Sequence, residues 1–286
     1  MRTGVVAVAG RPNVGKSTLV NALCGDKVAI TSPVPNTTRR RIFGVAHGDG
    51  WQLALVDLPG FQRPIDPLTE RMQGTVDGSF DDVDLVLLVV SARDRIGAGD
   101  RFVARRVFPL GVPVIIALNK IDRLTHAHVA AQMKTAATLG DFHALHPVSA
   151  KTKDGIDELR ADLVQLLPES PALFPPGQTT DLTVEERVAE VVREKALQLT
   201  REEVPHAITV VVEEVEDRRV RAVVLVETES QKGILVGKGG ATVREIGTRA
   251  RPEVEALLGR SVYLELAVKV RRHWRRDPRE LERLGL

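Results

Sequence analysis

The chain has 286 residues, 43% of them hydrophobic and 27% charged, with a net charge of +2; this composition excludes disordered and fibrous proteins, and the length accommodates two domains. The single cysteine, Cys24, excludes an internal disulfide, and no apolar run approaches the roughly 20 residues that a membrane-spanning helix needs. We therefore expect a soluble protein of the cytoplasm.

Short apolar runs alternate with helical stretches over the first 167 residues. The runs are β-branched or leucine-rich and end at Gly, Pro, Asp or Asn, as buried strands do. They occupy residues 5–9, 42–46, 53–56, 85–90, 114–118 and 144–148, and helical stretches such as 16–24 and 156–167 follow several of them. This alternation predicts an α/β domain whose mostly parallel sheet is covered on both faces, with a ligand site at the carboxyl ends of the strands.

A glycine-rich segment follows the first predicted strand. It is Gly10-Arg11-Pro12-Asn13-Val14-Gly15-Lys16-Ser17, a complete G-x-x-x-x-G-K-S between a strand and a helix. Backbone N–H groups of such a loop point at a phosphate, the lysine bridges the β- and γ-phosphates, and the serine hydroxyl holds Mg²⁺. We predict a phosphate-binding loop and include the next residue, Thr18, in the nucleotide site.

Two later segments are expected to complete the Mg²⁺ and γ-phosphate contacts. Residues 35–39 form a polar loop without periodicity, and of its two threonines we favour Thr38 as the Mg²⁺ ligand when a triphosphate is bound. Asp57-Leu58-Pro59-Gly60 follows the strand at 53–56, where Asp57 can reach Mg²⁺ through water and the Gly60 N–H can sense the γ-phosphate. An isolated D-x-x-G is more often a capped turn, but its place after a phosphate loop makes it a nucleotide motif.

The base is predicted from Asn119-Lys120-Ile121-Asp122, which follows the strand at 114–118. The N1–H and 2-amino donors of guanine can both be accepted by Asp122, whereas adenine would leave this carboxylate unpaired at a cost of roughly 1–3 kcal/mol. Asn119 can bond near O6, and the Lys120 stem can cover the base plane. Ser149-Ala150-Lys151, after the next strand, would supply a backbone N–H to O6. Guanine is therefore the favoured base.

Residues 168–183 are rich in proline and predict a linker between a domain at 1–167 and a second domain at 184–286. In the second domain we predict a helix at 184–199, strands at 206–212 and 220–226, a helical stretch that ends near Val236, a helix at 242–258 and a strand at 262–270. The order α-β-β-α-α-β predicts a compact sandwich of a three-stranded sheet and helices.

The turn Gly237-Lys238-Gly239-Gly240 lies between two of these helices. A G-x-x-G turn lets helix ends approach a sugar–phosphate backbone, as in KH domains, although the pattern alone fits a plain interhelical turn as well. Basic neighbours favour RNA, and we predict an RNA site formed by Lys232, Gly237, Lys238, Gly239, Gly240 and Arg244. We expect Ile234, Val236 and Ile246 to be core residues rather than base contacts.

The carboxy-terminal end is basic, with 13 Lys and Arg against 7 Asp and Glu in residues 231–286. This excess favours a polyanionic partner, but a solvated helical face would also account for it. Within the tail at 269–276, Trp274 can either stack on a base or pin the tail to its domain, and we favour the pin.

Together these motifs resemble the Era family of translation-factor-related GTPases, and the likeness runs through nearly all of the chain. Leu58 stands where that family usually has threonine in Asp-Thr-Pro-Gly. The resemblance implies a P-loop GTPase domain followed by a type II KH domain. It also implies GTP and GDP as ligands and slow GTP hydrolysis. The expected partners are 16S ribosomal RNA near its 3′ end and the 30S subunit, for a monomer that can associate peripherally with the inner face of the membrane.

Hydrolysis needs a group that stabilises developing charge, and the residue after Gly60 cannot supply it. Ras-like enzymes have a glutamine at this position, whereas here Phe61 is expected to pack and Gln62 is an alternative donor. Related GTPases with a hydrophobic residue here often use K⁺, and Asn13 resembles the ligand type of that site. We expect K⁺-assisted hydrolysis with Lys16, Thr38, Gly60 and Asn13 as the catalytic residues.

Two other functions remain open on the sequence. One is an RNA-binding module whose nucleotide is structural, which would bind GTP without turnover. The other is a P-loop phosphotransferase that acts on a small acceptor, whose nucleotide preference would not depend on Asp122.

Overall fold

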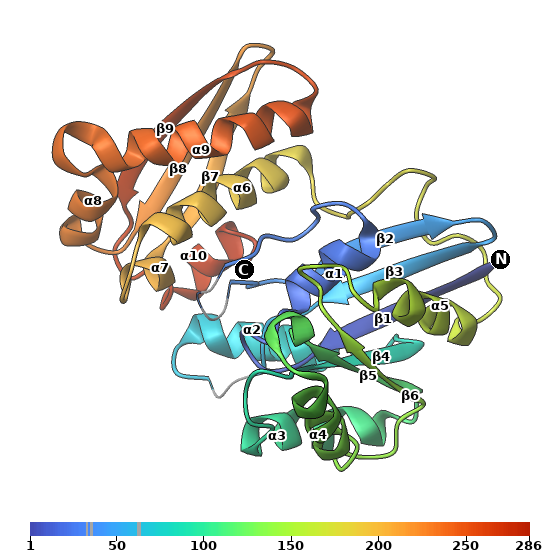
Figure 1. Cartoon of the computed structure of the whole chain (residues 1–286). Helices are drawn as coiled ribbons and strands as arrows, with labels where there is room; N and C mark the ends of the chain where they lie inside the picture. Colours follow the sequence, from blue (N-terminus) through green and yellow to red (C-terminus); the bar gives the residue numbers. More distant parts are fainter. Residues whose placement is uncertain (33, 35–36, 62–63) are drawn as a thin grey trace. The chain divides into compact units, whose positions relative to one another are not determined.

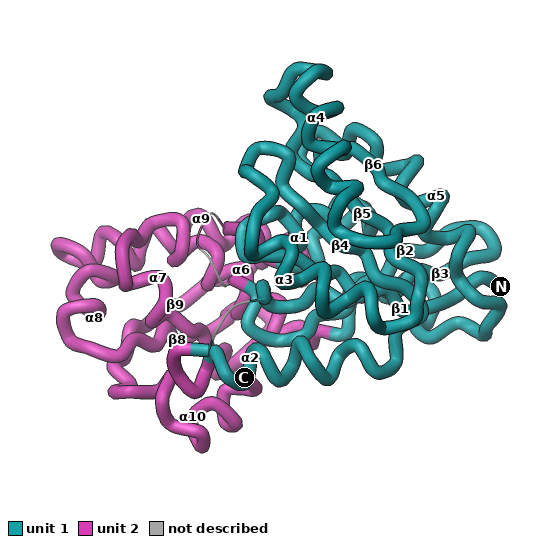
Figure 2. The backbone as a smooth tube through the Cα atoms, turned by 90° about the horizontal axis from the view of Figure 1, so that it is seen from below, with its two compact units in different colours: residues 1–29, 38–64, 69–181 teal, residues 30–37, 65–68, 182–286 magenta. Residues whose placement is uncertain are grey.

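A computed structural model describes residues 1–32, 34, 37–61 and 64–286. The chain forms two compact units, coloured separately in Figure 2. The first unit consists of Met1–Ala29, Thr38–Pro64 and Thr69–Asp181, and the second of Ile30–Thr37, Ile65–Leu68 and Leu182–Leu286. Among the described residues, no helix is long and apolar enough to cross a bilayer.

A six-stranded sheet forms the centre of the first unit, with the order β2-β3-β1-β4-β5-β6 (Figure 1). Only β2 is antiparallel to its neighbour β3, and the other pairs are parallel. The strands are β1 Arg2–Ala9, β2 Ile42–Gly48, β3 Trp51–Asp57, β4 Leu85–Ser91, β5 Val114–Asn119 and β6 Ala144–Val148. Each contains its predicted run, and the prediction of a mostly parallel sheet is confirmed.

Helices cover both faces of this sheet because successive strand residues point to opposite sides. Val6 and Val8 of β1 join a core with α1 and α5, whereas Ala7 and Ala9 join a second core with α2, α3 and α4. The elements between the strands are α1 Lys16–Cys24, α2 Pro67–Gly78, α3 Ala98–Val107, η1 Phe108–Leu110, η2 Ile121–Arg123, α4 His126–Ala136 and α5 Ile156–Leu166. The carboxyl ends of β1, β3, β5 and β6 therefore bring the sequence motifs to one edge.

The proline-rich segment after α5 packs against the first unit up to Asp181. Gln52 of β3 is almost fully buried, and its Oε1 accepts hydrogen bonds from the N–H groups of Leu173 (2.8 Å) and Phe174 (2.9 Å). The N–H of Val45 in β2 donates to the carbonyl of Thr179 at 2.8 Å. The segment that the sequence predicts as a linker is thus hydrogen-bonded to strands of the first unit at residues 173, 174 and 179, while the domain boundaries at 167 and 184 stay predictions.

The second unit contains a three-stranded sheet of order β7-β8-β9. The β7/β8 pair is antiparallel and β8/β9 is parallel, so α8 and α9 form the connection that a parallel pair requires. Its elements are α6 Val184–Leu199, α7 Val204–Ala207, β7 Thr209–Val215, β8 Arg219–Val226, α8 Glu229–Val236, η3 Lys238–Gly240, α9 Ala241–Leu258, β9 Tyr263–Val270 and α10 Pro278–Arg283. The predicted three-stranded sheet is confirmed.

The predicted strand at 206–212 is wrong at its start. Residues Val204–Ala207 form a helical turn, α7, and the strand begins at Thr209. Pro205 lies in the first turn of α7, where its fixed φ and missing N–H suit a helix start better than a strand interior.

The carboxy-terminal tail folds back onto the second unit. Trp274 is fully buried, and its Nε1 donates a hydrogen bond to the carbonyl of Ala207 at 3.0 Å. This confirms the prediction that Trp274 fixes the tail to its domain, and the buried indole ring of Trp274 is not available for stacking on a base. Arg271 pairs with Glu280 of α10, and Arg275 pairs with Glu227 at 2.7 Å, so part of the basic tail is already neutralised.

Candidate functional site

The phosphate loop connects β1 to α1 at the carboxyl edge of the first unit's sheet. Gly15, the residue before α1, has a φ of 98°, a left-handed conformation that glycine adopts without strain. A Cβ at this position would also come within 2.5 Å of the Asn119 side chain. The loop therefore needs glycine here both for its turn and for its close approach to the end of β5.

Lys16 begins helix α1 and is 7% exposed. Its Nζ donates hydrogen bonds to the carbonyls of Gly10 (3.2 Å) and Arg11 (3.1 Å), which holds the ammonium across the loop. Desolvation lowers the pKa of Lys16 to about 8, and the negative charge of Asp57 opposes this shift. A polyphosphate in the loop would supply the counter-charge that burial removes.

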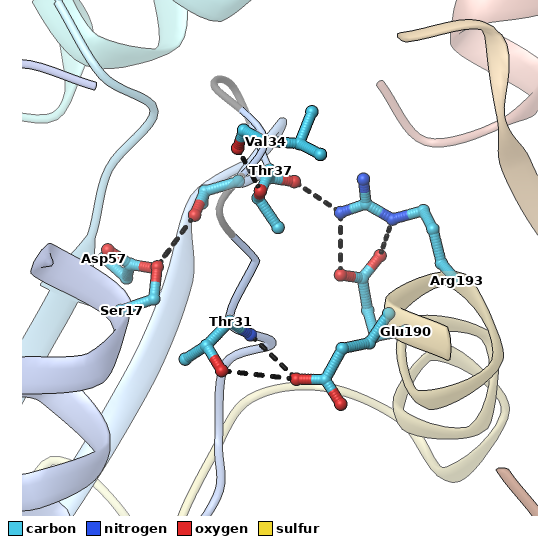
Figure 3. A network of polar contacts seen from close by, with 9 residues as sticks. Ser17, Thr31, Val34, Thr37, Asp57, Glu190 and Arg193 are labelled. Atoms are coloured by element: carbon cyan, nitrogen blue, oxygen red, sulfur yellow. Dashed lines mark hydrogen bonds and ion pairs between the residues drawn. The ribbon is translucent and has the colours of Figure 1, made fainter. Parts of the chain in front are cut away.

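Figure 3 shows Ser17 and Asp57 side by side, and the Thr38 hydroxyl bonds to the same carboxylate. The Ser17 hydroxyl donates to Asp57 Oδ2 at 2.7 Å, the Thr38 hydroxyl donates to the same oxygen at 3.1 Å, and the two hydroxyl oxygens lie 3.1 Å apart. Asp57 is fully buried, which raises its pKa. Its other oxygen, Oδ1, is buried without a hydrogen-bond partner among the described residues. Two hydroxyls and a carboxylate with a free oxygen are oxygen ligands of the kind that Mg²⁺ prefers.

Asn119, at the end of β5, ties three loops together. Its Nδ2 donates to the carbonyl of Val14 at 3.0 Å, and its Oδ1 accepts from the N–H groups of Lys120 (2.8 Å) and Ala150 (3.0 Å). The side chain is 2% exposed. Asn119 thus joins the phosphate loop to both segments predicted to recognise the base, a structural role in addition to the guanine O6 contact predicted for it.

A cavity of about 340 Å³ lies next to these loops, a size that suits a small ligand. Asp122 lines it, and the Asp122 Oδ1 accepts a hydrogen bond from the Ser149 hydroxyl at 3.1 Å. Lys120 also lines it and donates from Nζ to the carbonyl of Asn13, and burial lowers the Lys120 pKa. The remaining lining residues are Gly15, Thr18, Arg93, Asn119, Arg123, Ala150 and Lys151. The structure brings both segments predicted to recognise the base, and the phosphate loop, to one cavity.

The segment after Asp57 is packed into the core. Leu58 is fully buried, and Phe61 is 5% exposed and stacks on Phe80 with ring centroids 5.9 Å apart. A Cβ at Gly60 would come within 2.8 Å of Pro12, so Gly60 lies against the phosphate loop. The predicted packing role of Phe61 is confirmed. Gln62, the alternative donor, lies outside the described residues, as do Pro35 and Asn36 of the polar loop.

Three charged residues around the site were not predicted from the sequence. Arg93 and Arg123 line the cavity, and Asp100 of α3 is buried and accepts from Arg11 Nε at 2.7 Å. Arg93 follows strand β4, so the rule that ligand sites lie at the carboxyl ends of parallel strands could have identified it. No motif marks Asp100, because its pairing with Arg11 depends on tertiary structure.

The glycine-rich turn of the second unit connects α8 to α9. Gly237 has a φ of 71°, and a Cβ there would come within 2.8 Å of the Thr242 backbone nitrogen. The Gly240 N–H donates to the Gly237 carbonyl at 3.1 Å, and Arg244 Nη2 donates to the Gly239 carbonyl at 2.6 Å. The turn is therefore compact, and it has no Cβ that would obstruct a nucleic-acid backbone except that of Lys238.

A groove of about 400 Å³ adjoins this turn. It is lined by Gly240, Val243, Arg244, Gly247, Thr248, Arg251, Tyr263, Leu264 and Leu266. Ile246 is fully buried as predicted, but Ile234 is 47% exposed because its neighbour Leu235 takes the buried side of α8. Lys232 is not among the residues that line the groove. Its Nζ lies 3.9 Å from Glu229 Oε2.

Comparison with known proteins connects both sites to one family. Residues 5–120 match the family model described as 50S ribosome-binding GTPase, and residues 203–275 match that of the KH domain. GTPase Era of Mycobacterium sp. (strain KMS) is 44% identical over 99% of this chain and 98% of its own length. GTPase Era of Mycobacterium tuberculosis (strain CDC 1551 / Oshkosh) is 45% identical with the same coverage.

Two solved structures agree with this chain over its whole length. One is a variant of Aquifex aeolicus Era bound to GDP and AlF4⁻, with 38% identity, a TM-score of 0.96, and coverage of 100% of this chain and 99% of that one. The other is Era in complex with MgGDPNP and nucleotides 1506–1542 of 16S ribosomal RNA, with 38% identity, a TM-score of 0.94 and the same coverage. The chain therefore belongs to the GTPase Era family.

Proposed function

We propose that this chain binds Mg²⁺–GTP at the carboxyl edge of its six-stranded sheet and hydrolyses it. We also propose that the chain binds 16S ribosomal RNA near its 3′ end through the second unit, in assembly of the 30S subunit. The observation that carries the nucleotide part is the buried Asp57, whose Oδ1 has no partner among the described residues although two hydroxyls and the Lys16 ammonium surround the carboxylate. Mg²⁺ and a polyphosphate together would satisfy these groups.

Each group at the phosphate end has a defined task. Lys16 neutralises charge between the β- and γ-phosphates, and the Ser17 and Thr38 hydroxyls and Asp57 hold the Mg²⁺ that supplies positive charge at the same oxygens. Gly60 lies against the phosphate loop, where its N–H can donate to the γ-phosphate. These groups position the triphosphate and stabilise the charge that develops as its terminal bond breaks.

Phe61 cannot orient the attacking water, because its ring is packed against Phe80 and has no donor or acceptor. We therefore propose that K⁺ supplies the additional positive charge, with Asn13 of the phosphate loop as a ligand. Asn13 has a φ of 63°, and its carbonyl accepts from Lys120. Its strained backbone supports a specific task for this residue.

The RNA part of the proposal rests on the turn between α8 and α9. Its glycines leave room for a sugar–phosphate backbone, Lys238 offers a counter-charge, and the adjoining groove is lined by Arg244 and Arg251 together with apolar side chains. This combination suits a single strand, whose phosphates lie at the turn and whose bases lie over the groove. The Era structure that contains a 16S ribosomal RNA fragment supports the choice of RNA.

Asp122→Asn tests the base-recognition step. The variant carboxamide presents an N–H₂ donor to a position where xanthine has a carbonyl, so we expect affinity for xanthosine triphosphate to rise above that for GTP. Asp154→Asn, an exposed acid in the same part of the chain, is the matched control and should leave the preference unchanged. A preference for GTP that survives Asp122→Asn would favour the phosphotransferase, and GTP binding without turnover in the presence of RNA would favour the RNA-binding module.

A further inference from the structure

Three consecutive charged residues of α6 are buried in the second unit. Arg193 is 4% exposed, Glu194 1% and Lys195 7%. Successive residues of a helix point about 100° apart, so the apolar core that contacts Val188, Val191, Val192 and Ala196 cannot cover all three. Part of the cover comes from a segment far away in the sequence, because residues 30–37 belong to this same unit.

Two of these charged side chains, Arg193 and Glu194, bond to the backbone of that segment, and Figure 3 shows the contact between Arg193 and Thr37. Glu194 Oε1 accepts from the Thr31 N–H at 2.9 Å and from the Thr31 hydroxyl at 3.4 Å. Arg193 Nη2 donates to the carbonyl of Thr37 at 2.5 Å, and the Thr37 hydroxyl donates to the carbonyl of Val34 at 2.7 Å. The segment is thus held near each of its ends by residues one position apart on α6.

The two side chains are themselves fixed. Glu190, one turn earlier on α6, accepts from Arg193 Nε at 3.0 Å and from Nη2 at 2.9 Å, which fixes the plane of the guanidinium. Lys195 Nζ donates to Glu194 Oε2 at 2.7 Å and also to Glu253 of α9. Buried charges that are paired in this way are costly to move, so α6 presents a rigid donor and a rigid acceptor to the segment.

The residue that follows Thr37 is Thr38, whose hydroxyl lies 3.1 Å from both Asp57 Oδ2 and the Ser17 hydroxyl. The Thr37 carbonyl belongs to the peptide unit that joins these two residues, so fixing that carbonyl restricts where the Thr38 side chain can be. We propose that Arg193 and Glu194 are positioning residues that hold Thr38 ready for Mg²⁺–triphosphate. This inference rests on the proposed binding of Mg²⁺–GTP at the first unit.

The proposal predicts a selective effect on the triphosphate state. In this proposal Thr38 coordinates Mg²⁺ only when a γ-phosphate is present, whereas GDP is bound by the phosphate loop and the base-recognition segments. Without the Arg193 contact, triphosphate binding would have to order Thr37 and Thr38 as well, whereas GDP binding would not. By linkage, triphosphate binding must strengthen the contact between α6 and this segment by the same factor.

The test measures the affinities of the full chain for Mg²⁺–GDPNP and for GDP. Arg193→Met keeps the aliphatic stem and removes the donors, and we expect the GDPNP affinity to fall roughly tenfold or more while the GDP affinity changes by less than about twofold. Arg193→Lys retains one donor and should recover part of the loss. Arg260→Met is the matched control, because Arg260 holds the carbonyls of Glu216 and Asp217 elsewhere in the second unit.

Equal losses for GDPNP and GDP, or no loss for either, would overturn the proposal. If Arg193→Met does not fold, Arg193→Lys and Glu194→Gln carry the test: each weakens one contact and should lower the GDPNP affinity alone. A wild-type chain that binds no Mg²⁺–GDPNP would instead refute the proposed function. The two failures are therefore distinguishable in the same experiment.

Discussion

Raising the pH from 7 to 9 should weaken nucleotide binding, because the ammonium that faces the phosphates loses its proton. Burial lowers the pKa of Lys16 to about 8 in the nucleotide-free chain. A bound polyphosphate favours the charged form, so the pKa of Lys16 in the complex is higher than in the free chain. The nucleotide therefore binds with full affinity only well below pH 8, and the affinity falls as the pH rises through the pKa of the free chain.

The magnitude follows from the fraction of Lys16 that is charged. With a pKa of about 8, about nine in ten chains carry the ammonium at pH 7 and about one in ten at pH 9, which predicts an affinity for GDP about tenfold weaker at pH 9. Calorimetric titration of GDP in EDTA, at half-unit steps of pH, measures this change without a contribution from Mg²⁺. An affinity that stays flat between pH 7 and 9 would refute the assigned desolvation of Lys16.

Asp57→Asn provides the control for this experiment. The Asp57 charge raises the Lys16 pKa, so its removal should move the midpoint of the affinity loss to lower pH. Ionisation of the guanine base is common to both proteins, and the difference between their midpoints therefore reports Lys16. A midpoint that does not move, or that moves upward, would show that Asp57 does not act on this lysine.

Three further outcomes are expected. Lys238→Asp combined with Gly239→Asp should abolish binding of a 16S RNA 3′ fragment, in a gel-shift assay, and leave GTP affinity intact; normal RNA binding would contradict the KH assignment. Trp274→Ala should lower the free energy of unfolding of the second unit by about 3–5 kcal/mol in a urea titration, because it empties a fully buried site. GTP turnover should be faster in KCl than in NaCl, and equal rates would reject the K⁺ hypothesis for Asn13.

Local sequence was sufficient to predict those features that are formed by one continuous stretch of the chain. The helix at 16–24 and the helix at 184–199 have the bounds predicted for them, since each begins at a recognisable start and has regular apolar spacing. The α6 start even has a capping box, in which Thr183 and Glu186 bond reciprocally. The phosphate loop was predictable for the same reason, because its function depends on eight consecutive residues.

Prediction failed where a residue acts through tertiary structure. Gln52 lies among apolar residues of β3, and nothing in that pattern indicates that it bonds to the backbone of residues 173–174. Arg193 and Glu194 have the charge pattern of a solvated helical surface, but both are buried in the structure, where Glu194 bonds to Thr31 and Arg193 to Thr37. The sequence contains the contact partners, but their separation of more than 120 residues leaves no local pattern to detect.

The electrostatics of the phosphate end explain why metal and phosphate should bind together. Burial raises the pKa of Asp57 and lowers that of Lys16, so each group is shifted towards its neutral form by the loss of water. A phosphate alone stabilises Lys16 but repels Asp57, and Mg²⁺ alone stabilises Asp57 but repels Lys16. Only the two together supply a counter-charge to both groups, and each lowers the cost of binding the other. Cooperative binding of Mg²⁺ and nucleotide is therefore a consequence of burying this pair.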